Sequence, residues 1–311
     1  MRPRIGTLAA LVTLAILAAA CGTDEGEAET TTTPATTTTT AAPSTTTTAP
    51  TTSTAAATTT STAPEAEGIA VYFLLNELEA DAGGPFLVPV FREAREGSDM
   101  ALAAMEALVE GPDDGEMQGI PSISSAIPEG TSIRGVTVEE GLARVDLSDE
   151  FDDGGGSFSM FARLAQVVFT LTRIEEVDQV EFLIEGEPVT VFSAEGIELD
   201  SPQERSDYND LLPPIFVDSP AWGEPVDSPV AVSGLSNVFE AVSQVMLTDD
   251  DGAPLFEDSV MATCGTGCWG EWQIDVPYEV DRDQFGALIV WEYSAEDGSR
   301  INIREYPVHL R

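Results

Sequence analysis

The stretch SIRGVTVEEGLARVDLSDEFDDGGGSFSMFARLAQVVFTLT, residues 132–172, decides the fold of the first half of the chain. Apolar and polar residues alternate over Ser132–Val138 and Gly141–Leu147, on either side of a turn, which predicts a β-hairpin. Phe158–Thr172 then has apolar residues at helical spacing behind Ser157, a predicted N-cap. The residues expected on one face of this helix are Phe161, Leu164, Ala165, Val168 and Leu171.

Upstream of this stretch, the sequence predicts two strands and a helix. Ile69–Leu75 and Phe86–Arg92 are rich in β-forming residues, and Pro89 places the second strand at a sheet edge or bulge. Met100–Val109 predicts a helix with Ser98 as its N-cap, and Gly111-Pro112 ends that helix.

Downstream, Val180–Ile184 and Val189–Phe192 predict a closing hairpin around Glu187-Pro188. The element order is ββα, ββ, αββ. It predicts an α+β domain over residues 69–199, in which two helices cover one face of a mixed sheet.

The remaining sequence predicts a connector and an all-β domain. In the connector, residues 200–212, Ser201-Pro202 is expected to begin a short helix, which Pro213-Pro214 ends. Residues 213–311 hold seven short strands and no long helix, so we expect a β-sandwich. The expected strands are Ile215–Asp218, Pro229–Ser233, Ala241–Thr248, Ser259–Thr263, Glu271–Val276, Gly286–Tyr293 and Arg300–His309.

The first domain resembles the GerMN domain, the module named after the sporulation protein GerM. The resemblance lies in "VYFLL…FLVPVFR", "ALAAMEALVEGP", "SAIPEGTSIRGVTVEEGLARVDLSDEF" and "LAQVVFTLTRIEEVDQVEFLIEGEPV". It implies an α+β fold similar to the ring-building motifs of sporulation and secretion complexes, a self-associating or partner-binding role, and no known catalytic residues. Such modules also occur in actinobacterial lipoproteins that resemble partners of a membrane sensor kinase.

The second domain resembles the immunoglobulin-like domain of bacterial spore germination proteins, which often follows GerMN. "IFVDSPAWGEPVDSPVAVSGLSNVFEAVSQVMLTDDDG", "WGEWQIDVPY" and "EYSAEDGSRINIREYPVHL" carry this resemblance, with the signature VSGLSNVFE at residues 232–240. It implies a sandwich with a non-enzymatic binding or spacer role. It does not imply that the organism makes spores.

Residues 1–20 are expected to be a signal peptide. Arg2 and Arg4 precede the apolar run Leu8–Ala20, which is shorter than the roughly 20 residues that span a bilayer. The run ends on Cys21, and small residues before a cysteine resemble the lipobox of bacterial lipoproteins, although Ala18 stands where leucine is usual. We therefore expect lipidation of Cys21; cleavage at an Ala-x-Ala site is the alternative.

Residues 21–68 are expected to form a disordered tether between this anchor and the domains. Thr30–Pro64 contains only Thr, Ala, Pro and Ser, so it cannot bury enough apolar surface to offset its ordering entropy. Thr and Ser mixed with Pro are also typical of an O-glycosylated stalk. The folded domains are thus expected outside the cell, anchored to the outer face of the cytoplasmic membrane.

The charge balance excludes several classes of partner. The chain has 13 Arg and no Lys against 55 Asp and Glu, a net charge of −42. Clustered cations are required to bind nucleic acid or an anionic lipid surface, so neither is an expected partner of the domains. The acidity is typical of a hydrated, salt-tolerant extracellular coat.

Residues with catalytic or ligand chemistry are few. Cys264 and Cys268, in CGTGC, are expected to form a disulfide, since an exported protein meets an oxidising compartment; a redox or metal pair is the alternative. His309 is the only histidine, so a catalytic triad or a zinc site would depend on it. Acidic turns at residues 149–153 and 249–252 offer calcium-type oxygen ligands without matching the EF-hand pattern.

These observations predict a non-enzymatic surface lipoprotein with no cofactor, no metal and no catalytic residue. Its partners are expected to be the membrane, through the lipid on Cys21, and envelope proteins or further copies of itself. The alternative is an envelope enzyme or solute-binding receptor that acts on cell-wall material or a cationic ligand. A cleft with several convergent carboxylates of perturbed pKa would favour that alternative.

Overall fold

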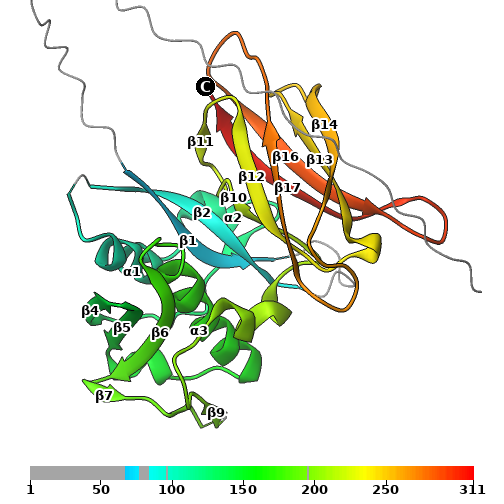
Figure 1. Ribbon diagram of the computed structural model, residues 1–311. Helices are drawn as coiled ribbons and strands as arrows, with labels where there is room; N and C mark the ends of the chain where they lie inside the picture. The colour runs from blue at the N-terminus through cyan, green and yellow to red at the C-terminus, as the bar shows by residue number, and fades with distance from the viewer. Residues whose placement is uncertain (1–66, 77–83, 96, 195) are drawn as a thin grey trace, which may run out of the picture. The chain divides into compact units, whose positions relative to one another are not determined.

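The computed structural model describes residues 67–76, 84–95, 97–194 and 196–311, all within one compact unit (Figure 1). The predicted signal segment, Cys21 and the Thr-rich tether lie outside these residues. Within the described part, no helix is both long and apolar enough to cross a bilayer.

The first sheet is antiparallel and consists of three strands. Strand β1 (Glu67–Leu75) lies in the middle, between β2 (Phe86–Ala94) and the short β3 (Ile123–Ser124). Strand β3 pairs only with Leu74 and Leu75, so most of β1 has a strand neighbour on one side only. The prediction that Pro89 marks an edge strand is confirmed, because β2 is an outer strand of this sheet.

The second sheet contains the hairpin that the alternating pattern predicts. Strands β4 (Ile133–Glu139) and β5 (Gly141–Leu147) pair antiparallel, and β5 pairs parallel with β6 (Val177–Ile184). Strand β6 then turns into the two-residue β7 (Glu187–Pro188) through Glu185-Gly186, both at positive φ, as a tight hairpin turn requires.

The predicted closing hairpin around Glu187-Pro188 is therefore wrong in its pairing. Strand β8 (Val191–Phe192) does not return to β6 but pairs with β9 (Ile197–Glu198). The turn lies at Glu185-Gly186, two residues earlier than predicted, so Glu187 and Pro188 belong to the returning strand and pair with Ile184 and Leu183.

The two main helices lie between these sheets. Helix α1 (Met100–Glu110) contacts β1 and β4, and α3 (Ser157–Leu171) contacts β1 and β6. Every residue of α3 from Ala162 to Leu171 is buried, so the helix has no solvent face there. The expectation of one sheet covered on one face is thus corrected to two sheets with helices between them. Phe161 is half exposed, not in the core.

Both predicted N-caps are wrong by one residue. Asp99 caps α1, because its carboxylate accepts hydrogen bonds from the amides of Ala101 and Leu102, whereas Ser98 donates to the carbonyl of Arg95. Gly156 is the N-cap of α3 and has no side chain to form a capping bond. The turn-rich segment before residue 130 also contains a short helix, α2 (Asp114–Gln118), which the sequence did not predict.

The C-terminal domain is the expected sandwich of two sheets (Figure 1). One sheet has the order β10-β12-β15, and the other β11-β17-β16-β13-β14. The observed strands are β10 (Ile215–Ser219), β11 (Pro225–Val226), β12 (Val230–Ser236), β13 (Val242–Thr248), β14 (Pro254–Met261), β15 (Gly270–Val276), β16 (Gln284–Tyr293) and β17 (Arg300–Leu310).

All seven predicted strands are present, with two differences. Strand β14 begins five residues before the predicted Ser259, and β11 was not predicted. In the connector, the short helix is the 3₁₀ segment η2 (Arg205–Leu211), not a helix that begins at Ser201-Pro202. One continuous cluster of buried apolar residues extends from β1 through η2 to the sandwich.

Candidate functional site

Arg205 joins three parts of the chain at the junction between the domains. Its Nη1 lies 2.9 Å from Oδ2 of Asp218 on β10, and its Nη2 donates to the hydroxyl of Tyr72 on β1 over 3.1 Å. Its Nε donates to Oγ1 of Thr172, and Nη2 also donates to the carbonyl of Phe169, at the end of α3. A single guanidinium therefore connects the first domain, the connector and the sandwich.

An aromatic cluster surrounds this guanidinium. Tyr72, Phe169 and Phe216 contact one another with ring centroids 5.3 to 6.4 Å apart, and Arg205 lies over the rings of Tyr72 and Phe169. Tyr72 also donates its hydroxyl hydrogen to the carboxylate of Asp218. Burial raises the pKa of Tyr72 far above its usual value, although the charge of Arg205 opposes that rise. The hydroxyl therefore stays protonated, as a donor.

A backbone connection reinforces the junction. The amide of Trp222 donates to the carbonyl of Pro89 over 2.8 Å, and the amide of Phe91 donates to the carbonyl of Trp222 over 3.0 Å. These bonds make a parallel bridge between Trp222 and Val90 on the outer edge of β2. A segment of the C-terminal domain thus covers the edge of the first sheet.

A cavity of about 310 Å³ opens beside the junction. Residues of β1, β2, α1 and the end of α3 form its walls, and Glu224 of the C-terminal domain completes them. The lining residues are Gly68, Ile69, Ala70, Phe91, Met100, Ala104, Thr170, Arg173, Ile174, Glu175, Glu176 and Glu224.

The free side of β1 faces this cavity. Because the amide of Phe91 donates to Trp222, away from β1, its partner Ala70 must also direct its amide and carbonyl away from β2. Tyr72 repeats this geometry two residues later, and there the side chains of Thr170 and Gln166 satisfy both backbone groups. At Ala70 no hydrogen bond occupies this side of the strand within residues 67–311 that the structure describes.

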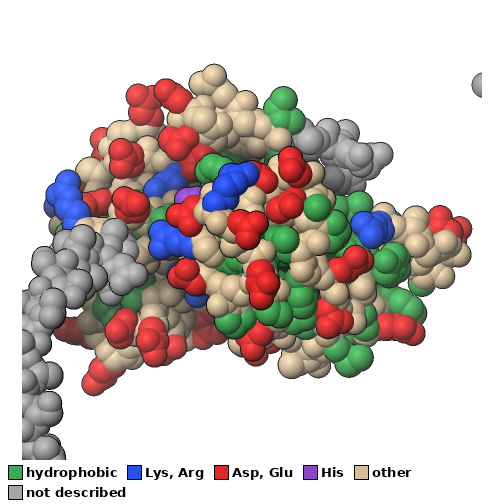
Figure 2. Space-filling model, turned by 90° about the horizontal axis from the view of Figure 1, so that it is seen from above, with side chains coloured by type: hydrophobic (Ala, Val, Ile, Leu, Met, Phe, Trp, Pro, Cys, Tyr) green, Lys and Arg blue, Asp and Glu red, His purple; other side chains and the backbone are tan. Residues whose placement is uncertain are grey.

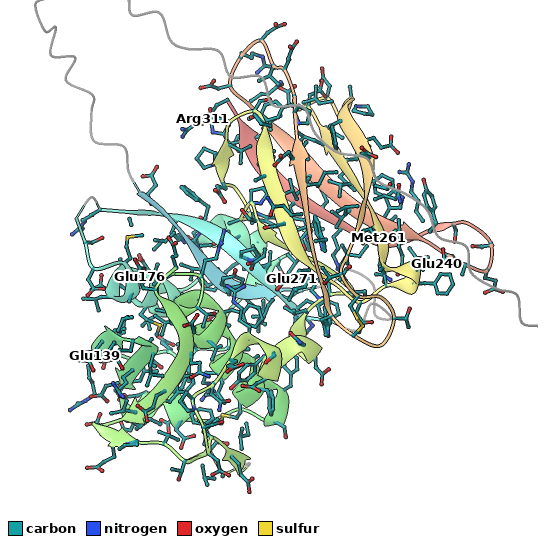
Figure 3. All side chains as sticks on the ribbon, in the orientation of Figure 1. Glu139, Glu176, Glu240, Met261, Glu271 and Arg311 are labelled. Carbon is teal, nitrogen blue, oxygen red and sulfur yellow. A yellow bond between two sulfur atoms is a disulfide. The ribbon has the colours of Figure 1, made fainter. Side chains whose placement is uncertain are left out.

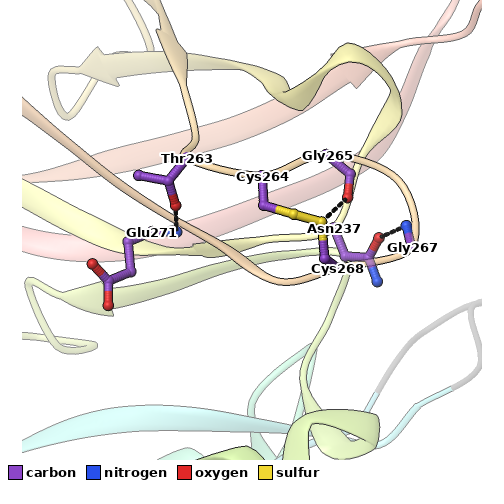
Figure 4. The surroundings of a disulfide bond; sticks show 7 residues. All are labelled: Asn237, Thr263, Cys264, Gly265, Gly267, Cys268 and Glu271. Carbon is purple, nitrogen blue, oxygen red and sulfur yellow. Dashed lines mark hydrogen bonds between the residues drawn. A yellow bond between two sulfur atoms is a disulfide. The ribbon is translucent and has the colours of Figure 1, made fainter.

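The predicted cysteine pair lies in the sandwich, away from these residues. Cys264 and Cys268 are joined by a disulfide with their Cα atoms 5.9 Å apart (Figure 4). Asn237 accepts a hydrogen bond from the amide of Gly267, and Thr263 accepts one from the amide of Glu271. The disulfide loop is thus tied to the signature segment that contains Asn237.

The other residues singled out by sequence have structural partners. His309 on β17 packs its ring against Phe285, with ring centroids 5.2 Å apart. In the turn at residues 249–252, the Asp249 carboxylate accepts hydrogen bonds from the amides of Asp251 and Ala253, while Asp250 pairs with Arg282. Among the described residues, no group of three or more His, Cys, Asp or Glu is placed to hold a metal ion.

Acidic side chains cover much of the surface. Figure 2 shows Asp and Glu spread over the visible face, with a few arginines between them. The junction itself was not predicted from the sequence. Its one local signal is Arg205, an isolated cation in the acidic connector SPQERSDYND.

Solved structures similar to this chain include GerMN proteins. The first GerMN domain of the sporulation protein GerM from Bacillus subtilis is 20% identical, with a TM-score of 0.38, and the alignment covers 45% of this chain and 99% of that one. The tandem GerMN domains of the same protein are 16% identical, with a TM-score of 0.39, over 68% of this chain and 62% of that one. A putative lipoprotein from Clostridium perfringens is 18% identical, with a TM-score of 0.32, over 47% of this chain and 93% of that one.

No curated protein matches the chain. Two family models do match it. The Germane model, described as sporulation and spore germination, matches residues 70–190. The Gmad2 model, described as the immunoglobulin-like domain of bacterial spore germination, matches residues 214–299. The chain therefore has a GerMN-type α+β domain followed by an immunoglobulin-like domain of the bacterial spore germination kind.

Proposed function

We propose that this protein is a non-enzymatic surface lipoprotein whose two domains act together as one binding or scaffold module in the cell envelope. The lipid on Cys21 anchors the chain to the outer face of the cytoplasmic membrane. The Thr-rich tether, residues 21–68, holds the module away from the bilayer. Its partner is an envelope protein.

The observation that carries this proposal is the junction. Two domains joined only by a linker would present independent surfaces, whereas Arg205, Tyr72 and Asp218 fix one domain against the other. Such fixation favours a composite surface, because binding then loses no interdomain freedom. The cavity lined by both domains is such a surface.

The family matches support a binding role over catalysis. Both models describe modules of sporulation and spore germination. The polar groups at the junction stabilise the structure: each nitrogen of the Arg205 guanidinium donates to a protein partner, and Tyr72 is buried.

Photo-crosslinking in living cells tests the proposal. A benzoylphenylalanine is placed at Glu176, which lines the cavity, and in a second strain at the exposed Met261 on β14 of the C-terminal domain. Captured proteins are identified by mass spectrometry, and we expect an envelope protein to be enriched at residue 176 and not at 261. Capture of no protein at either position, or cleavage of cell-wall material by the purified chain, would contradict the proposal.

The anchor has its own test. Cells that express the parent chain and Cys21→Ser are grown with radiolabelled palmitate and fractionated. We expect label and membrane association in the parent and neither in the variant. An unlabelled parent chain in the culture medium would instead indicate cleavage to a free secreted protein.

A further inference from the structure

We propose that the free edge of β1, with the cavity beside it, binds an extended polypeptide segment of a partner that carries a basic side chain. This inference rests on the proposed binding function and specifies the chemistry of the ligand. Three independent features carry it: unpaired backbone groups, an open space next to them, and a negative surplus of charge around that space.

The first feature is the backbone of β1. Alternate residues of this strand direct their amide and carbonyl away from β2. Strand β3 pairs with Leu74, and α3 side chains satisfy Tyr72, whereas Ala70 keeps both groups free within the described structure. Gly68 continues the same alternation at the exposed start of the strand. An unpaired strand edge of this kind is a template for an added strand.

The second feature is the space along this edge. The side of β1 that would receive an added strand opens into the cavity of about 310 Å³. At Gly68 the ring of Phe91 fills the position that a Cβ would take, so that face of the strand is covered. Gly68 itself is exposed, so its backbone at the edge of β1 is open to solvent.

The third feature is charge. Glu175 and Glu176 line the cavity from the loop after α3, and Glu224 lines it from the C-terminal domain, against one cation, Arg173. The net charge of −42 for the whole chain adds an attractive field for cations. An acidic or phosphorylated segment is disfavoured by the same charges.

The lining of the cavity matches the chemistry of a long basic side chain. Its walls are apolar where Ile69, Met100 and Ile174 line them, and carboxylates lie among the same lining residues. Arginine and lysine have an aliphatic stem that packs on apolar surface and a charged end that remains near carboxylates or water. Because Glu224 belongs to the other domain, the junction determines how the two sets of walls face each other.

Peptide binding to the chain with Cys21→Ser, which cannot be lipidated, tests the inference. The probe is fluorescein-labelled Val-Arg-Val-Arg-Val, and Val-Glu-Val-Glu-Val is its control. We expect fluorescence anisotropy to report binding of the arginine peptide only. N-methylation of alternate backbone nitrogens should abolish that binding, because the ladder needs those donors.

Two variants separate the features. Ala70→Pro removes an amide donor that does not bond to β2. We expect it to weaken peptide binding by about tenfold or more, because the peptide loses at least one hydrogen bond to β1. The pair Glu175→Gln with Glu176→Gln should weaken binding several-fold and reduce its salt dependence. The matched control, Glu240→Gln with Glu271→Gln, makes the same change of charge on exposed residues of the C-terminal domain, which Figure 3 shows apart from Glu176.

The outcomes distinguish this inference from the proposed function. Equal binding of both peptides, or arginine-peptide binding that neither variant weakens, would overturn the inference. So would sedimentation of the parent as a dimer that Ala70→Pro dissociates, because the edge would then pair with a second copy. Capture of an envelope protein without peptide binding would leave the proposed function intact and remove only this site. If circular dichroism shows that Ala70→Pro does not fold, peptide binding by the variant Glu175→Gln with Glu176→Gln tests the inference instead.

Discussion

Nη1 of Arg205 lies 2.9 Å from Oδ2 of Asp218, so an ion pair links the connector to the first strand of the immunoglobulin-like domain. Both side chains are about one-fifth exposed, and Tyr72 from the first domain hydrogen-bonds to both. Burial alone would lower the pKa of Arg205, but the charge of Asp218 and the hydrogen bonds to Asp218 and Tyr72 raise it above its usual value. The guanidinium of Arg205 therefore keeps its charge at neutral and alkaline pH.

Arg205→Met should destabilise the protein by about 2–3 kcal/mol, because it leaves a partly buried carboxylate without its cation. Urea unfolding of the chain with Cys21→Ser measures this. In a double-mutant cycle, Asp218→Asn combined with Arg205→Met should cost less than the two single losses added together. Strict additivity would show that the two groups do not interact.

Tyr72→Phe should weaken the dependence of stability on pH above 10. Burial raises the pKa of folded Tyr72, while the unfolded tyrosine ionises near 10.0. Above that pH the unfolded state binds fewer protons than the folded state, so the free energy of unfolding falls as pH rises. Unfolding midpoints from pH 8 to 11 check this.

At neutral pH the same substitution should cost about 1–2 kcal/mol, through the lost hydrogen bond to Asp218. Burial also raises the pKa of Tyr306, to about 12. Because Tyr306 is present in both proteins, the variant should still lose some stability at alkaline pH. Identical alkaline slopes in parent and variant would show that Tyr72 is not held protonated by the fold.

Gly234→Ala should destabilise the sandwich by about 2–3 kcal/mol. Gly234 belongs to the signature VSGLSNVFE on β12, and an added Cβ would collide with the carbonyl of Phe216 on β10. Gly135→Ala is the matched control, because nothing lies within 4 Å of its Cβ position. We expect the control to change thermal stability by less than about 0.5 kcal/mol. If Gly234→Ala left the stability unchanged, β10 and β12 would have to lie further apart than the structure shows.

Replacement of both Cys264 and Cys268 by serine should cost only about 2 kcal/mol, since the loop that the disulfide closes is very short. The expected result is a modest drop in the melting temperature with unchanged peptide binding. The same drop should follow reduction of the parent protein. If the variant lost peptide binding, the conformation of the disulfide loop would have to affect the binding site at the cavity.

The local elements of the fold were predictable from the sequence. Alternation of apolar residues around Gly141 specifies the β4–β5 hairpin, and turn signals separate the strands of the sandwich. The helix caps differed by one residue because Ser98 and Asp99 are both good caps, and only the structure shows which side chain accepts the amide hydrogens.

The arrangement of these elements was not predictable in the same way. From Phe161 onward the sequence of α3 has an amphipathic pattern, which predicts one face in solvent. In the structure α3 lies between two sheets, because the second sheet covers that face. The junction depends on Tyr72 and Asp218, which are 146 residues apart in the chain. No local pattern reports a contact at that separation.

We propose that the two domains form one rigid module through Arg205. The most direct measurement is ¹⁵N relaxation of the deuterated chain with Cys21→Ser, which gives a rotational correlation time for each domain on the nanosecond timescale. We predict one shared correlation time in the parent and two shorter, different times in Arg205→Met. Two different times in the parent itself would contradict the claim, because the domains would then tumble independently of the junction.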